Sequence, residues 1–127
     1  MNELLVPDYA TRTYPHDVEV QLHFLPTAAG GRAGPAYTGY RPQLFYSGQD
    51  WDAVHTYPDV TMANPGDTVR AYLGFLSPHE HVGRVAVGMP FLVREGARTV
   101  AYGVVTAMLS LEASANRALH TGSRGAV

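Results

Sequence analysis

The chain has 127 residues, no cysteine and a formal net charge of −2 at pH 7. A chain of this length forms one domain and buries roughly two-thirds of its unfolded surface, which is enough for an ordinary hydrophobic core. The lack of cysteine excludes disulfides and thiolate metal sites, and the slightly acidic balance argues against a dedicated nucleic-acid binder, because such proteins are usually basic.

The N-terminal region carries neither a secretory signal nor a clear secondary-structure pattern. Residues 1–8 lack the basic flank and the long apolar region of a signal peptide, and no apolar run in the chain approaches the roughly 20 residues of a membrane-spanning helix. We therefore expect a cytoplasmic protein without a membrane partner. Residues 1–16 show no regular period, and Pro7 and Pro15 interrupt any helix there, so we expect an irregular N-terminal arm.

Two strand patterns flank a long loop in the first half of the chain. Residues 17–25 alternate between apolar and polar side chains, as in a half-buried strand. Residues 30–43 are rich in Gly and Pro and carry two arginines and two tyrosines, so they are expected to form a shaped loop that exposes backbone amides and cationic side chains. Residues 43–46 are expected to form a short strand, followed by a turn at 47–50. Trp51, the only tryptophan, is expected to have a structural role with its N–H paired.

The second half of the chain contains four more strand patterns. The turn between the first two, residues 64–67, has Pro in its second place and Gly in its third, where a positive φ is needed. Gly96 can supply the left-handed residue of a short loop between the last two. About six strands at turn-punctuated spacing, with little helix, predict an all-β barrel or sandwich. These four strands are expected at residues 59–63, 68–76, 89–94 and 98–109.

The strand pattern is lost after residue 109. Residues 111–119 are compatible with a short helix, which would need packing to be stable, and residues 121–127 are expected to be disordered. The expected organisation is therefore an N-terminal arm at residues 1–16, a β-barrel domain at 17–109 and an irregular C-terminal tail at 110–127.

Three motifs occur in order along the chain. They are Gly30-Gly31-Arg32 with Gly39-Tyr40-Arg41-Pro42-Gln43, then Asn64-Pro65-Gly66-Asp67 before an alternating strand, then Arg94-Glu95-Gly96-Ala97-Arg98-Thr99-Val100 leading into Gly103-Val104-Val105-Thr106. Together they resemble the signature motifs of the C-terminal β-barrel domain of elongation factor Tu. The resemblance implies the six-stranded antiparallel barrel of that translation-factor family over roughly residues 17–109.

The resemblance implies binding and not catalysis. The sequence contains neither the Gly-x-x-x-x-Gly-Lys-Ser/Thr phosphate loop nor the Asn-Lys-x-Asp guanine-recognition motif. The resemblance therefore does not extend to GTP binding or hydrolysis. In the family, the matching domain contacts the T-stem of aminoacyl-tRNA, packs against the GTPase domain and meets the nucleotide-exchange factor. We therefore expect no cofactor and no small-molecule substrate, and a partner that is either a protein, with a GTPase domain among the candidates, or a tRNA-like RNA.

Some positions of the family's tRNA-facing set are kept and others differ. Arg32 matches the loop arginine, Gln43 matches the glutamine after Arg-Pro, and Glu95-Gly96 matches the hairpin tip against the T-stem backbone. Ala33 replaces a histidine, and Ser77 stands where a lysine is common, which removes a phosphate contact. The expected RNA- or partner-binding residues are Arg32, Arg41, Gln43, Arg94, Glu95 and Gly96.

These residues also have simpler interpretations. Arg32 and Arg41 can brace the loop by bonding carbonyls and stacking on tyrosines, Tyr40 is expected to pack within the loop, and Glu95-Gly96 can be only a hairpin tip. The segment His79-Glu80-His81 could supply metal ligands together with His55, but a catalytic zinc site needs three converging ligands, so a solvated loop is the default.

Three functions remain open at this point. The first is a non-catalytic binding module for a protein partner or an RNA stem. The second is a tRNA-binding, translation-associated protein that retains the T-stem surface, and the third is a metal-dependent enzyme. An RNA binder should show a contiguous positive patch, whereas a protein binder should expose apolar side chains. The arginines of such a patch would be Arg32, Arg41, Arg94 and Arg98, and the apolar candidates are Tyr37, Tyr57 and Tyr72. We expect a protein partner.

Overall fold

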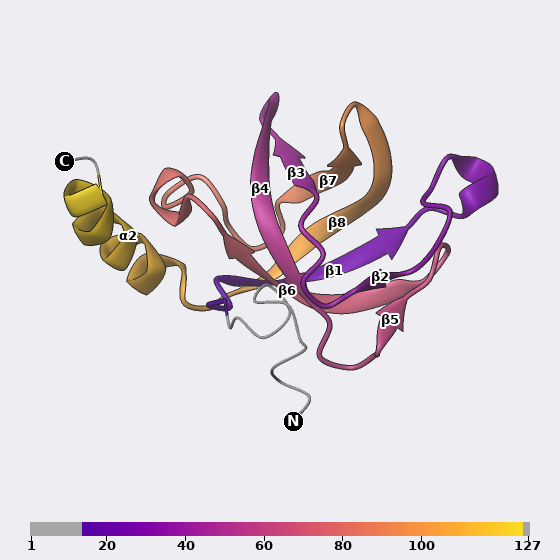
Figure 1. Ribbon diagram of the computed structural model, residues 1–127, viewed down its shortest axis with the longest axis horizontal. Helices are drawn as coiled ribbons and strands as arrows, with labels where there is room; N and C mark the ends of the chain where they lie inside the picture. The colour runs from indigo at the N-terminus through magenta and orange to yellow at the C-terminus, as the bar shows by residue number, and fades with distance from the viewer. Residues whose placement is uncertain (1–13, 126–127) are drawn as a thin grey trace.

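The computed structural model describes the backbone of residues 14–125 and the side chains of residues 14–119. Six antiparallel strands form a closed barrel in the order β1-β6-β4-β3-β7-β8, which confirms the predicted all-β architecture. Figure 1 shows the barrel at the centre, with short strands β2 and β5 on one side and helix α2 on the other. The strands are β1 (Val18–Phe24), β2 (Ala36–Tyr37), β3 (Gln43–Tyr46), β4 (Gln49–Thr56), β5 (Met62–Ala63), β6 (Thr68–Phe75), β7 (Pro90–Glu95) and β8 (Arg98–Met108).

Strand β1 illustrates why the barrel forms. Its alternating apolar side chains all point into the core, and none is more than 1% exposed. Each such side chain stabilises the fold by about 1.5–3 kcal/mol through burial. The strand is hydrogen-bonded to β6 on one side and to β8 on the other, so it presents no free edge. The side chains concerned are Val18, Val20, Leu22 and Phe24.

Strand β4 corrects the sequence prediction. Only a turn was expected at residues 47–50, but Ser47 and Gly48 alone make the turn, with φ of 51° and 77°. Positive φ at both central residues is the geometry of a two-residue hairpin, and it pairs Tyr46 with Gln49 at the start of β4. The sequence pattern of β4 was hard to recognise because its three consecutive residues 53–55 are all buried. The strand therefore lacks the alternation of apolar and polar residues that marks a half-buried strand.

The strand predicted at residues 59–63 is wrong as a barrel strand. Only Met62–Ala63 are extended, as β5, and they pair with Ala36–Tyr37 of β2 in a separate two-stranded sheet. The other predicted strands are confirmed within one or two residues at each end. The barrel is therefore completed by β4, and the small sheet supports the long loop that precedes β3.

The C-terminal segment is more regular than expected. Helix α2 spans Leu111–Gly125, where an irregular tail with at most a short helix at 111–119 was predicted. Leu111 and Ala115 are buried against the rest of the protein, and this packing provides the stability that an isolated short helix lacks. Of the expected N-terminal arm, residues 1–13 lie outside the described residues. Within the described part of the chain, no helix has the length and apolar character to span a membrane.

Candidate binding face

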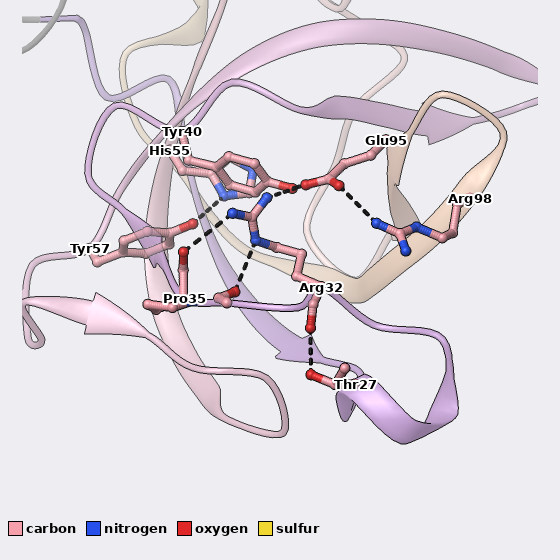
Figure 2. Close-up of polar contacts among 9 residues, drawn as sticks. Thr27, Arg32, Pro35, Tyr40, His55, Tyr57, Glu95 and Arg98 are labelled. Atoms are coloured by element: carbon pink, nitrogen blue, oxygen red, sulfur yellow. Dashed lines mark hydrogen bonds and ion pairs between the residues drawn. The ribbon is translucent and has the colours of Figure 1, made fainter.

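Four side chains from distant parts of the chain meet at one face of the barrel (Figure 2). Glu95 lies at the end of β7, and one of its carboxylate oxygens accepts hydrogen bonds from the Arg32 guanidinium and the Tyr40 hydroxyl. The other oxygen accepts a hydrogen bond of 3.2 Å from Arg98, the first residue of β8. We call these four residues, Arg32, Tyr40, Glu95 and Arg98, the Glu95 cluster.

The loop before β3 fixes the position of Arg32. Its Nε and Nη2 donate to the carbonyl oxygens of Gly34 and Pro35, each at 3.2 Å, and its guanidinium carbon lies 4.5 Å from the centre of the Tyr40 ring. The preceding residue must be glycine, because a Cβ on Gly31 would lie 2.0 Å from the carbonyl oxygen of Leu25. The Gly-Gly-Arg sequence therefore lets the loop pass close to the end of β1 and present the arginine.

The β7–β8 hairpin positions the other half of the cluster. Glu95 and Arg98 are paired across the hairpin, and Gly96 has a φ of 62°, as a two-residue turn requires. This confirms the left-handed turn conformation expected for Gly96. Gly96 and Ala97 are exposed at the tip, so the backbone of the turn and the Glu95 cluster form one continuous face.

The electrostatics of the cluster keep it charged. Burial alone raises the pKa of the Glu95 carboxyl, but hydrogen bonds from Tyr40, Arg32 and Arg98 and the charge of Arg32 outweigh it, so the pKa lies below its ordinary value of 4.5. Burial and the neighbouring Glu95 raise the pKa of the Tyr40 hydroxyl above its ordinary value of 10.0. At neutral pH the cluster therefore holds one carboxylate, two guanidinium groups and a neutral phenol.

Arg94 and Gln43 lie beside the cluster on adjacent strands. They are cross-strand partners in β7 and β3. The Arg94 guanidinium lies 4.5 Å above the ring of Phe45, and its Nε is 3.7 Å from a carboxylate oxygen of Asp50. Arg94 therefore lies beside a carboxylate and over an aromatic ring, although its Nε and the facing Asp50 oxygen are not hydrogen-bonded to each other.

Arg41 is placed apart from the other predicted site residues. It is exposed and lines a shallow depression of about 320 Å³ with Tyr14, Gly39 and Val54. None of the Glu95 cluster residues is among that lining. Within residues 14–119, no carboxylate forms an ion pair with Arg41.

The structure therefore brings together most of the predicted set and adds residues that were missed. Arg32 and Glu95 are in contact, Gly96 follows in the turn, and Gln43 and Arg94 lie alongside. Tyr40 was expected to pack only within the loop, and Arg98 was considered only as part of a positive patch. The contact between Glu95 and Arg98 could have been predicted from the sequence, because the two residues flank a two-residue hairpin turn. Asp50, the partner of Arg94, had no such signal.

Of the three histidines considered as metal ligands, His55 and His81 lie in two separate buried clusters, and His79 is exposed. Nδ1 of His55 is hydrogen-bonded to the Tyr57 hydroxyl at 2.9 Å, and Nδ1 of His81 is hydrogen-bonded to the Tyr46 hydroxyl at 2.6 Å. Burial lowers the pKa of His55 to about 3, and burial, together with Arg84 and His79, lowers the pKa of His81 to about 4. Over the described part of the chain, no three His, Asp or Glu side chains converge as a metal site would require.

Comparison with known proteins identifies one family. Residues 12–109 match the model of the elongation factor Tu C-terminal domain. The match covers most of the 127-residue chain and includes every residue of the Glu95 cluster. It ends before α2 begins at Leu111.

Proposed function

This chain belongs to the elongation factor Tu C-terminal domain family, and we propose that it is a non-catalytic binding module whose partner is a protein. The family relates the chain to translation factors. The 127 residues contain no phosphate loop or guanine-recognition motif, so the proposed role is to dock on another molecule. We place that role in the cytoplasm, with a translational GTPase domain as the first candidate partner.

The observation that supports a protein partner is that carboxylates lie beside the arginines and reduce the net positive charge of this face. Arg32 and Arg98 share the Glu95 carboxylate, and Arg94 lies beside Asp50. These carboxylates weaken the attraction of this face for a nucleic-acid phosphate, because affinity for nucleic acid depends on uncompensated cations that release counterions. A mixed-charge face of this kind is instead complementary to a protein surface that also carries both signs of charge.

The proposed contact residues follow from exposure and position. The Arg98 side chain is 56% exposed and the Glu95 side chain 30%, so both can form additional contacts without leaving each other. The exposed turn at Gly96 offers backbone groups at the tip. We therefore propose a protein-docking face formed by Arg32, Gln43, Arg94, Glu95, Gly96 and Arg98, with Arg41 lying apart from it.

One observation favours RNA as a second candidate. Arg41 is exposed, and no carboxylate of the described residues pairs with it, so it is available for a phosphate contact. If the chain retains the T-stem surface of its family, Arg41 and the exposed side of Arg98 would provide the two cations. Such a surface offers few phosphate contacts, so its affinity would be low at physiological salt.

The test uses elongation factor Tu from which the C-terminal domain has been removed. Binding of this truncated factor to the purified full chain is measured by fluorescence anisotropy, with tRNA titrated in parallel. The proposal predicts binding of the truncated factor that Arg98→Glu weakens by about tenfold or more, since it places like charges together. The matched control is Arg70→Glu, which changes an arginine of the outer network with Glu19 and Asp59. Equal effects of the two variants, or tRNA binding alone, would reject the proposal.

A further inference from the structure

We propose that the groove between residues 77–88 and helix α2 is a second docking site, which takes a protein segment that presents apolar side chains next to lysine or arginine. We call it the loop–helix groove. In Figure 1 helix α2, which forms one wall, lies on the opposite side of the barrel from the loop that carries η2 (Thr27–Ala29) and leads to the Glu95 cluster. The inference is independent of the face proposed above.

One wall of the groove is fixed to the barrel by His81. Helix η3 (Pro78–Glu80) leads into this residue, which is fully buried. The imidazole stacks on Phe75, with 4.1 Å between ring centres, and meets the edge of Trp51 at 4.7 Å. Arg84 covers the same Trp51 ring at 5.5 Å. The loop is therefore anchored by its own side chains and does not depend on a ligand for its shape.

The other wall is anchored at the first turn of α2. The Ser114 hydroxyl donates to the buried Asp17 carboxylate, whose second oxygen accepts from the backbone N–H of Phe75 at 2.8 Å. Arg117 donates to the Ser114 oxygen at 3.2 Å, which places this cation on the Asp17 side of the helix. Leu111 and Ala115 are buried. Glu112, Asn116 and Leu119 line the hollow beside the loop.

Between these walls lie two adjoining hollows of about 490 and 240 Å³. Both are lined by Val82 and Glu112, so they form one groove along the helix. The groove runs along α2 from its start to Leu119, and its length is about 12 Å because an α-helix rises about 1.5 Å per residue. A length of this size accommodates about two turns of a docked helix or about four extended residues.

The lining combines exposed apolar side chains with negative charge. Val82, Met108 and Leu109 are 42%, 41% and 47% exposed, more than a monomer needs to leave in one place. Glu112 lines both hollows, and no cation within the described residues forms an ion pair with it. Glu80 lines neither hollow, but its carboxylate lies 3.7 Å from His79, which lines the larger hollow, and its backbone carbonyl accepts a hydrogen bond from Arg84.

This charge pattern selects the occupant. The arginines of the two walls are turned away from the groove, Arg84 onto Trp51 and Arg117 onto Ser114. The apolar floor would be covered by apolar side chains, and the carboxylate of Glu112, which lines both hollows, would pair with a lysine or arginine beside them. A nucleic acid would meet carboxylates and apolar carbon here, so we exclude it as the occupant.

One wall of the groove lies outside the region that matches the family. The family match ends at residue 109, whereas the helix that forms one wall begins at Leu111. Docking at the loop–helix groove would therefore add a contact that the family barrel does not encode, separate from the Glu95 cluster.

The probe is a fluorescein-labelled synthetic amphipathic helix of about four turns, with leucines on one face and lysines on the flanks. A second peptide has the same leucines with glutamates in place of the lysines. Anisotropy titrations of the full chain at moderate salt should show the lysine peptide binding at least about tenfold tighter than the glutamate peptide. Similar affinities, or no binding of the lysine peptide, would overturn the proposal.

Matched variants locate the binding site. Val82→Asp should weaken binding of the lysine peptide at least about tenfold, because it places a charge on the apolar floor. Val60→Asp is the control, since Val60 is 40% exposed and lies outside the groove. Equal effects of the two variants would overturn the proposal. Arg98→Glu should leave peptide binding unchanged, which separates this site from the Glu95 cluster, and Trp51 fluorescence verifies that each variant is folded.

Discussion

At the scale of single residues, the Glu95 cluster depends on one carboxylate that serves three donors. Sequence motifs identified Arg32 and Glu95 separately as contact residues, but their pairing could not be predicted because they are 63 positions apart. The hydroxyl of Tyr40 joins them and was likewise not foreseen. Motifs of this kind report which residues a family retains, whereas their partners depend on how the loop closes over the barrel.

Removing the carboxylate should destabilise the protein measurably. Glu95→Gln keeps the shape of the side chain but removes the charge between two guanidinium groups, so we expect the free energy of unfolding to fall by about 1–2 kcal/mol. Arg70→Ala is the control, because Arg70 is 42% exposed and its ion pairs with Glu19 and Asp59 lie on the surface, where such pairs contribute about 0–1 kcal/mol. Urea unfolding measures both. A larger loss for Arg70→Ala would contradict this view of the cluster.

The two buried histidines should make stability depend on pH. Burial lowers the pKa of His55 to about 3 and that of His81 to about 4, below the value near 6.5 that each has when unfolded. The unfolded state therefore binds more protons below pH 6.5, and stability falls as the pH falls.

Urea unfolding at pH 7.5 and pH 5.5 tests this linkage. We expect a loss of about 2–3 kcal/mol for the two histidines together, with the sign given above. In His81→Gln, about half of this pH dependence should disappear, whatever the absolute stability of the variant. Stability that is unchanged between these pH values would show that the imidazoles are not held neutral by burial.

At the scale of elements, the loop before β3 depends on glycine at Gly31 but not at Gly34. A Cβ on Gly31 would lie 2.0 Å from the Leu25 carbonyl oxygen, whereas nothing lies within 4 Å of a Cβ on Gly34. Gly31→Ala should therefore reduce the free energy of unfolding by about 1–3 kcal/mol through overpacking. Gly34→Ala should have almost no effect. Thermal or urea unfolding compares the two, and equal stabilities would mean that the loop does not pass as close to Leu25 as described.

Helix α2 should depend on a single buried hydrogen bond at its first turn. Ser114→Ala leaves the buried Asp17 carboxylate without one of its donors, which costs about 1–3 kcal/mol. Burial already raises the pKa of Asp17 above its ordinary value of 3.8. In Ser114→Ala, the loss of this hydrogen bond should accelerate amide hydrogen exchange in α2 more than in the barrel strands. Ala113→Ser, on an exposed position of the same helix, is the control, and equal protection in both variants would contradict the proposed anchor.

The elements also show where sequence patterns succeed and fail. Strand β1 was predicted because only one of its faces is buried, which produces a clear alternation. Strand β4 was missed because its buried run at 53–55 has no alternation, and α2 was underestimated because its stability comes from packing on residues far away in the chain. The two errors share a cause, since both elements are defined by tertiary contacts more than by local pattern.

At the scale of the whole molecule, the family resemblance predicted the barrel, and the order of its strands could not have come from periodicity alone. The function depends on how charge is distributed over that barrel. Three of the arginines considered for RNA binding, Arg32, Arg94 and Arg98, have carboxylate neighbours. The partner of each arginine depends on the folded arrangement, so the net charge of −2 gave only a general indication.

The most direct test of the central claim is the salt dependence of binding in one assay. The full chain is titrated with tRNA and with elongation factor Tu lacking its C-terminal domain, at about 50 and 200 mM salt. If the chain is a protein-docking module, the truncated factor should bind at both salt concentrations. tRNA should bind no better than non-specifically, with a Kd of about 10⁻⁴–10⁻⁶ M. Tight tRNA binding at low salt that falls about a thousandfold at high salt, without binding of the truncated factor, would contradict it.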